Sequence, residues 1–353
     1  MTASPRLGFE LLSGNPVVHS GSMRKAARAT GNLVISLDFE LLWGVRDHAT
    51  RESYGPNVFG GRKALPVLLE VFERRGIKAT WAIVGALLCE NKDELLARAE
   101  HAARDGAMIS RLDEIGADEQ SDPYHFGASL ARLIASCPGQ EIGTHTFSHR
   151  CALEPGETLA GFSADVASAL VQLREWGIRS KSIVFPRNQY GAKHLEICRS
   201  LGLTHFRGNE AKWYYAPRPG GRQTRALRIC RLIDSYIDLS GSNVSYPESE
   251  VDAVLVNVAS SRFLRPFYRG AALLDGLRLR RVKEAMLEAA LTCGTFHLWW
   301  HPENFGKNLA DNVAALTKVL DWFEQLRDSH GMQSRAMHEI KGGVPSAPEA
   351  YAA

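Results

Sequence analysis

The sequence predicts an α/β fold, which we expect to be an irregular (β/α) barrel of about seven strands in a single domain. Short apolar segments alternate along the chain with segments that repeat apolar residues at helical spacing. Polar residues follow the carboxyl ends of several predicted strands, as in barrel active sites: Asp38, His145, Arg187 and His301. A doubly wound sheet would instead gather such residues around one switch point, so the barrel is favoured.

The predicted elements follow one another as repeated βα units. Strands are expected at residues 33–37, 78–84, 141–143, 182–185, 204–206 and 295–300. Helices are expected at residues 64–74, 92–103, 126–136, 157–176, 193–201, 282–291 and 308–326. Between residues 211 and 260 the periodicity is weak, and strand-like pieces at 227–233 and 254–258 indicate an insertion or a distortion of the barrel.

The barrel is expected to span residues 32–330, between a flexible N-terminal extension at 1–31 and a C-terminal tail at 331–353. The net charge of +3 is spread along the chain, which argues against a nucleic-acid partner. The N-terminal segment lacks the apolar core of a secretory signal, and no apolar run approaches the ~20 residues of a membrane span. We therefore expect a cytoplasmic protein without a transmembrane segment, and the sequence leaves its oligomeric state open.

Two histidines four residues apart are the sharpest chemical signal in the chain. His145 and His149 share one face if the chain turns helical after the preceding strand, and such a pair suits a zinc-type ion. The six cysteines form no CxxC pair, so any metal must rest on nitrogen and oxygen ligands. A pair of surface or capping histidines is the alternative, because this spacing also arises by chance among 12 histidines.

Two carboxylates stand at the end of the first predicted strand. Asp38 and Glu40 are two residues apart, so both side chains point to the same side of the strand. One can complete the ligands of a metal while the other takes a proton from the attacking water. A helix cap or a loop salt bridge is the alternative. The residues thus predict a metal-dependent hydrolase and leave the two carboxylate roles open.

These motifs resemble those of the polysaccharide deacetylases, carbohydrate esterase family 4, which remove N- or O-acetyl groups from sugars. The resemblance covers residues 33–326 and comprises four motifs in family order. In the first, the family's usual adjacent aspartates are replaced by Asp-x-Glu, which implies that Asp38 is the general base and Glu40 a metal ligand, with the two roles exchangeable. The second implies that His145 and His149 bind the metal.

The third motif looks like residues 185–191, although the residue order after its arginine differs from the usual family pattern. It implies that Arg187 holds the base carboxylate, and that the loop near Tyr190 lines the acyl pocket with a backbone N–H facing the oxyanion. For Arg187, an ordinary structural ion pair is the alternative.

The fourth motif, residues 296–302, resembles the strand that delivers the family's catalytic histidine. It implies that His301 is the general acid that protonates the leaving amine. His297 lies deeper on the same strand face and is predicted to be a hydrogen-bonded core histidine. Trp299 is either a core residue or an apolar wall for a sugar.

Three further arginines are candidates for contact with substrate. Arg207 follows another short predicted strand. Arg262 and Arg265 suit a phosphate or carboxylate of an activated sugar, with a surface or helix-start role as the alternative.

The resemblance implies a metal-dependent deacetylase acting on an N-acylated sugar or sugar conjugate in surface polysaccharide biosynthesis. The expected cofactor is a divalent ion, with zinc preferred and cobalt, nickel or manganese as alternatives. Two other functions stay open, namely a catalytically inactive carbohydrate-binding barrel and a deformylase or amidase that acts on a non-polysaccharide substrate.

Overall fold

A parallel sheet forms the centre of the protein. The computed structural model describes residue 1 and residues 30–103, 112–246 and 255–342. The strands lie in the order β6-β5-β4-β3-β2-β1-β8-β7, β9 pairs with β1, and the described pairings are parallel. They are β1 (Asn32–Phe39), β2 (Ala79–Ile83), β3 (Gln140–Thr144), β4 (Ser182–Ile183), β5 (His205–Phe206), β6 (Val256–Asn257), β7 (Arg262–Phe263), β8 (Thr295–Trp300) and β9 (Gln333–Arg335).

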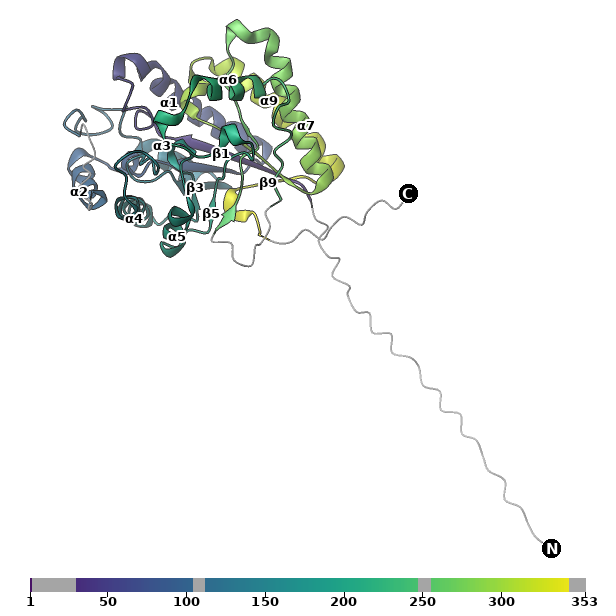
Figure 1. The fold of residues 1–353 in the computed structure, drawn as a ribbon, viewed down its shortest axis with the longest axis horizontal. Coiled ribbons are helices and arrows are strands. Elements are labelled where there is room, and N and C mark those ends of the chain that lie inside the picture. The colour runs from purple at the N-terminus through teal and green to yellow at the C-terminus, as the bar shows by residue number, and fades with distance from the viewer. Residues whose placement is uncertain (2–29, 104–111, 247–254, 343–353) are drawn as a thin grey trace.

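Helices cover the sheet on its outside. In Figure 1, α2, α4 and α5 lie along one side of the sheet, and α7 and α9 lie along the other. The helices are α1 (Arg51–Arg75), α2 (Lys92–Ala102), α3 (Ala128–Ser136), α4 (Leu159–Glu175), α5 (Ala192–Ser200), α6 (Arg225–Asp234), α7 (Asp275–Thr292), α8 (Pro302–Gly306) and α9 (Leu309–His330). Among the helices in the described part of the chain, none is both long and apolar enough to cross a membrane.

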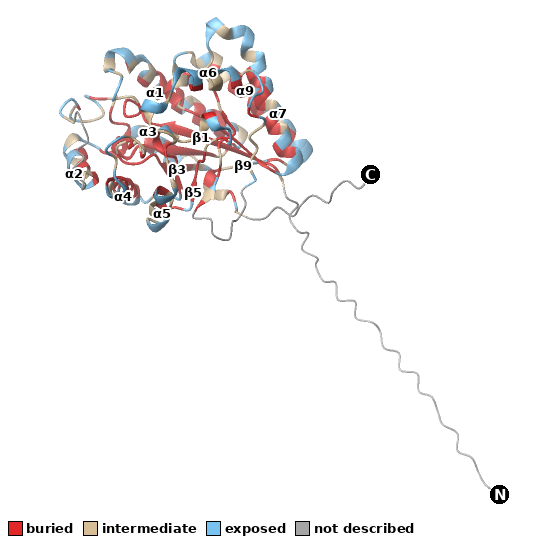
Figure 2. Cartoon of the chain, in the orientation of Figure 1, coloured by how far each residue is buried: buried red, intermediate tan, exposed pale blue. Residues whose placement is uncertain are grey.

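Burial on both faces explains the apolar strand sequences. Residues 33–39 of β1 and all of β2 are buried, and Figure 2 shows the buried residues concentrated in the central sheet. The carboxyl ends of these parallel strands meet at one end of the sheet, which is where the polar residues of the motifs follow them.

The barrel has one irregular seam, between β6 and β7. β6 pairs with β5 and β7 pairs with β8, and the short segment between them bridges the seam. In this segment, the Ser260 N–H donates to the Gly208 carbonyl at 2.8 Å, and the Ser261 N–H donates to the His297 carbonyl at 2.9 Å. The predicted α/β fold with an irregular barrel is therefore confirmed. The sheet has nine strands instead of about seven, because it includes β9 and several strands of only two residues.

Helix α1 begins 13 residues before its predicted start at residue 64, because its glycines resemble a loop in sequence. Its N-cap is Thr50, whose side chain accepts from the Ser53 N–H in a capping box. Gly60 and Gly61 lie inside the helix, where α8 packs directly against it. A Cβ at Gly60 would lie 2.8 Å from the Gly306 Cα, so the close approach of the two helices requires glycine.

Two other expectations need correction. Residues 227–233, predicted as strand-like, belong to helix α6, which starts where the Thr224 side chain accepts from the Leu227 N–H. The predicted tail at 331–353 begins too early, because Gln333–Arg335 forms β9 and pairs with β1. The strand-like piece at 254–258 contains β6. Most of the predicted extension at 1–31 lies outside the described residues.

Candidate metal centre and active site

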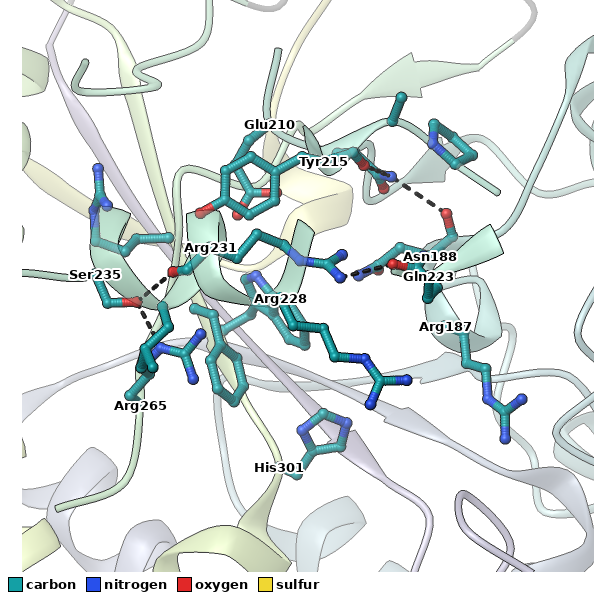
Figure 3. Close-up of a pocket in the computed structure, with 17 residues that line it drawn as sticks. Arg187, Asn188, Glu210, Tyr215, Gln223, Arg228, Arg231, Ser235, Arg265 and His301 are labelled. Carbon is teal, nitrogen blue, oxygen red and sulfur yellow. Dashed lines mark hydrogen bonds between the residues drawn. The ribbon is translucent and has the colours of Figure 1, made fainter. Parts of the chain in front are cut away.

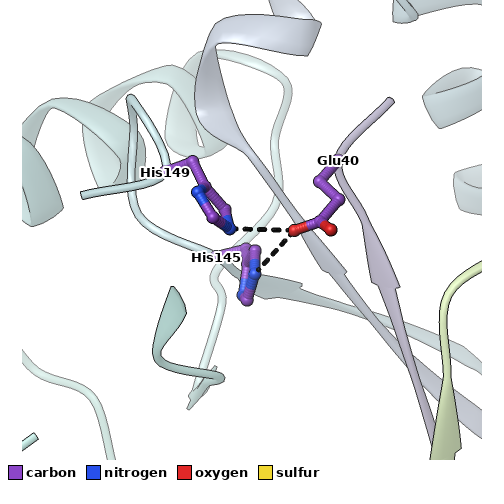
Figure 4. A group of neighbouring side chains, drawn as sticks. All are labelled: Glu40, His145 and His149. Carbon is purple, nitrogen blue, oxygen red and sulfur yellow. Dashed lines mark ion pairs between the residues drawn. The ribbon is translucent and has the colours of Figure 1, made fainter. Parts of the chain in front are cut away.

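Glu40, His145 and His149 converge at the carboxyl ends of β1 and β3. The His149 Nε2 lies 2.9 Å from the Glu40 Oε2, and the His145 Nε2 lies 3.3 Å from the same oxygen (Figure 4). The three potential ligand atoms lie within 4.8 Å of one another, and all three residues are buried. Two imidazole nitrogens and one carboxylate oxygen form a donor set that suits a catalytic zinc-type ion.

Neighbouring groups orient His145 and set the charge environment of His149 at the candidate metal site. The His145 Nδ1 lies 2.8 Å from the Val184 carbonyl, so this nitrogen carries the proton and the Nε2 is free to bind a metal. Burial alone would lower the pKa of His149, but the charge of Glu40 raises it to about 9. The residues therefore fit a cation at this position.

The histidine segment is a loop, and the expected helical turn is wrong. Thr146 and His149 both have positive φ values, of 62° and 60°. Asp165 of α4 holds this loop, because its Oδ1 accepts from the Phe147 N–H at 2.7 Å and its Oδ2 accepts from the Ser148 hydroxyl at 2.5 Å. The two rings thus meet through a held turn, with their centroids 5.1 Å apart.

Asp38 is held by a buried arginine close to the candidate metal ligands. Both Arg207 terminal nitrogens donate to its carboxylate, each at 2.7 Å, and Arg207 is 1% exposed. Burial raises the pKa of Asp38, yet the neighbouring Arg207 guanidinium holds it below its usual value. Asp38 is therefore an ionised carboxylate that accepts hydrogen bonds close to the three candidate ligands.

A chain of hydrogen bonds through Ser36 and His297 fixes the position of Arg207. Burial lowers the pKa of His297 to about 3, so the ring is neutral and its Nδ1 donates to the Val258 carbonyl at 2.9 Å. The Ser36 hydroxyl then donates to the His297 Nε2 at 2.9 Å and accepts from Arg207 at 3.0 Å. The predicted core role of His297 is confirmed, and it serves to position the arginine.

His301 lies between the carboxylates and a cavity. Its Nε2 is 3.2 Å from the Glu40 Oε1 and 3.8 Å from the Asp38 Oδ2, and its side chain is 23% exposed. The ring also lines a cavity of about 490 Å³, beside Trp299 and Phe263 (Figure 3). This volume is typical of small-molecule sites. A ring in this position can exchange a proton with a ligand in the cavity.

Arg187 and Arg207 do not have the partners that were expected of them. Arg187 was expected to hold the base carboxylate, but its side chain pairs with Asp47 at 2.5 Å and lies 3.9 Å from Glu154. Arg207 was expected to contact substrate, but it is buried against Asp38. Both expectations about contacts are therefore wrong. The difference lies in where each arginine leaves the sheet, since Arg207 directly follows β5 whereas Arg187 lies in the turn after β4.

The two aromatic candidates differ in their surroundings. The Tyr190 ring packs on Phe185 and Phe206, and its hydroxyl accepts from the Asn209 N–H at 3.3 Å. Tyr190 is not among the residues that line the cavity, so its expected contact with substrate is not supported. Trp299 does line the cavity, and the Arg207 guanidinium lies 4.1 Å from the centre of its ring.

Two residues that sequence reasoning missed help to shape the site. The Glu303 Oε1 accepts from the Leu41 N–H at 2.7 Å, which fixes the backbone next to Glu40, and burial raises the pKa of Glu303 to about 8. The Asn188 Oδ1 accepts from Arg207 at 3.0 Å, and this residue also lines the cavity. Glu303 directly follows the fourth motif and Asn188 lies within the third, which was the available signal.

No protein-family model matches the chain, and no curated protein matches it. Solved structures do align with it. A protein from Mycobacterium smegmatis, described as a polysaccharide deacetylase, aligns at 11% identity over 92% of this chain and 97% of that one, with a TM-score of 0.48. A family 4 carbohydrate esterase from Streptomyces lividans, solved with acetate, aligns at 12% identity over 90% and 98%, with a TM-score of 0.41. Members of carbohydrate esterase family 4 recur among these structures, and several of the structures are of a pseudoenzyme of that family.

The aligned structures also include an enzyme of another class. A GH57-type branching enzyme from Pyrococcus horikoshii aligns at 13% identity over 90% of this chain and 72% of that one, with a TM-score of 0.48. At such identities the likeness concerns the fold alone. The functional conclusion must therefore come from the side chains of this chain.

Proposed function

We propose that this protein is a metal-dependent hydrolase that removes an N-acyl group, most simply acetyl, from a sugar or sugar conjugate. The observation that carries the proposal is the convergence of two histidines and Glu40 beside an ionised Asp38 and a partly exposed His301. We further propose a cytoplasmic role in surface polysaccharide biosynthesis, which rests on the resemblance of the motifs.

Each residue has a defined part in this reaction. Glu40, His145 and His149 would hold a divalent ion, which supplies an activated water and polarises the acyl carbonyl. Asp38 accepts the proton of the attacking water, because Arg207 keeps its carboxylate ionised. His301 faces the cavity and donates a proton to the leaving amine, which is otherwise a poor leaving group.

One experiment tests whether the protein is active and which acyl group it releases. Purified protein is analysed for bound metal and assayed for acetate and formate release from N-acylated sugars. Acetate release with bound metal supports the proposal. Formate release alone would indicate a deformylase. Absence of both metal and turnover, with sugar binding intact, would favour the inactive carbohydrate-binding barrel.

His149→Ala is expected to abolish stoichiometric metal uptake, because it removes one of only three ligands. His301→Ala should keep the metal and slow turnover by about 10²–10⁴. Metal content by elemental analysis and turnover by acetate release distinguish the two roles. His330→Ala, at an exposed position near the end of α9, is the matched control and should change neither. Loss of metal in both His149→Ala and His301→Ala would contradict this division.

A further inference from the structure

The cavity beside His301 has a strongly cationic wall. It lies over the carboxyl ends of β4, β5, β7 and β8, and the segment that contains α6 closes it on the other side. Its lining includes five arginines and a single carboxylate, that of Glu210. This excess of positive charge is greater than a neutral sugar requires.

Two of these arginines have carboxylate partners. Arg187 pairs with Asp47, and the Arg262 guanidinium lies 3.7 Å from Asp234. Glu210 is buried near Arg207 and Arg262, whose charges oppose the rise that burial causes in its pKa. Asp47 and Asp234 are thus balanced without the three remaining arginines, whereas the charge of Glu210 also acts on one of them, Arg231.

The remaining arginines are Arg228, Arg231 and Arg265, which we call the arginine cluster. The structure records no ion pair to a described carboxylate for any of them. Arg231 donates to the Gln223 side chain at 2.7 Å, and Arg265 donates to the Ser235 hydroxyl at 2.5 Å. Arg228 and Arg231 are three residues apart on α6, so they project from the same face of the helix. Figure 3 shows the Arg228 side chain extending toward the side of the cavity that holds His301.

Part of this charge is withdrawn from water. Arg231 and Arg265 are half-buried, and burial lowers the pKa of both. Removing a charged group from water without a counter-charge is unfavourable. A bound anion would offset that cost, whereas a neutral polysaccharide chain would not.

We infer that the arginine cluster binds the phosphate or pyrophosphate group of a phosphate-linked N-acyl sugar, and thereby presents its acyl group to His301 and the metal centre. This inference rests on the proposed function. Three guanidinium groups match the charge of a phosphate diester pair or pyrophosphate better than the single charge of a sugar carboxylate. Trp299 and Phe263, on the same cavity wall, offer flat apolar surfaces for the sugar between the two sites.

The first test measures binding of inorganic pyrophosphate by calorimetry to the metal-loaded full-length protein. The double variant Arg228→Gln/Arg231→Gln should bind at least about tenfold more weakly than the wild type, because each charge-assisted hydrogen bond contributes strongly. Arg225→Gln is the matched control, since Arg225 lies on α6 but does not line the cavity, and its affinity should be unchanged. Because pyrophosphate also binds divalent ions, the titrations are repeated with metal-free protein, and only a difference between variants that persists there is assigned to the arginine cluster.

Arg265→Gln should weaken pyrophosphate binding in the same way. Because Arg265 lies outside α6, a loss of affinity in this variant would not come from a local effect on that helix. Affinity should also fall as salt rises. Equal affinity of the wild type, the double variant and Arg265→Gln would overturn the inference.

The second test compares deacylation of three substrates, namely a free N-acetyl sugar, a nucleoside diphosphate-linked sugar and a polyisoprenyl phosphate-linked sugar. A kcat/KM at least about tenfold higher for either phosphate-linked form supports the inference, and the preferred form identifies the carrier. Equal rates for all three would overturn the inference while leaving the proposed function standing. Cluster-dependent pyrophosphate binding without acyl release from any of them would leave the anion site standing and reject the proposed function.

Discussion

Asp38→Asn is expected to lower kcat for acyl release by about 10²–10⁴, because an amide cannot accept the proton that a general base must take. The substitution keeps the size of the side chain and an oxygen that can accept from Arg207, so the fold should persist, although at a cost in stability because the buried Arg207 loses its counter-charge. Metal content should also persist, since Glu40 and not Asp38 contacts both histidines. Acetate release and elemental analysis on the same preparation measure the two quantities.

The control for this change is Asp47→Asn, which removes an exposed carboxylate that pairs with Arg187. Its kcat should stay within a few-fold of the wild type. If Asp38→Asn lost the metal instead, the roles of Asp38 and Glu40 would be reversed. Full activity in Asp38→Asn would exclude Asp38 as the base.

Arg207→Gln is expected to destabilise the protein by about 3–5 kcal/mol, because it leaves the buried Asp38 carboxylate without its counter-charge. Arg187→Gln should cost less than about 1 kcal/mol, since its pair with Asp47 is exposed. Free energies of unfolding from urea titration compare the two. The double variant Arg207→Gln/Asp38→Asn should recover much of the lost stability, because it removes the unpaired charge. Equal losses at positions 187 and 207 would contradict the assigned pairing.

Arg207→Gln should also change the pH dependence of activity. In the wild type the lowered pKa of Asp38 keeps the base ionised at acidic pH, and its contribution to stability is present above its unfolded pKa, about 3.9, and lost as pH falls through the folded pKa. Without Arg207, the largest of the charges that oppose the effect of burial is lost and the pKa of Asp38 rises. The acid limb of the kcat/KM profile should therefore move to higher pH in any folded Arg207→Gln protein.

The sequence predicted the fold class and the convergence of Glu40, His145 and His149 because both depend on local patterns. Buried strands have unbroken apolar sequences, and the residues that follow them must share one end of a parallel sheet. The placement of Glu40 beside His145 and His149 therefore agrees with the expectation from strand ends alone.

The features that the sequence did not predict depend on distant contacts. Arg187 and Arg207 both follow short strands, and only their register in the barrel decides that Arg207 reaches Asp38. Gly60 and Gly61 resemble a loop in sequence, yet their role is to let α1 approach α8. Helix α6 has an amphipathic sequence, yet apolar residues such as Ile229 are exposed on its surface, so it does not bury its apolar residues as an ordinary core-facing helix does.

The central claim is that Glu40, His145 and His149 share one cation, and a crystal structure of the metal-loaded protein with anomalous diffraction at the metal edge tests it most directly. We predict a single strong anomalous peak, bound by the Nε2 atoms of both histidines and by a Glu40 oxygen, each at roughly 2.0–2.2 Å for zinc. A peak ligated by Asp38 in place of Glu40, or one located away from these three residues, would contradict the account.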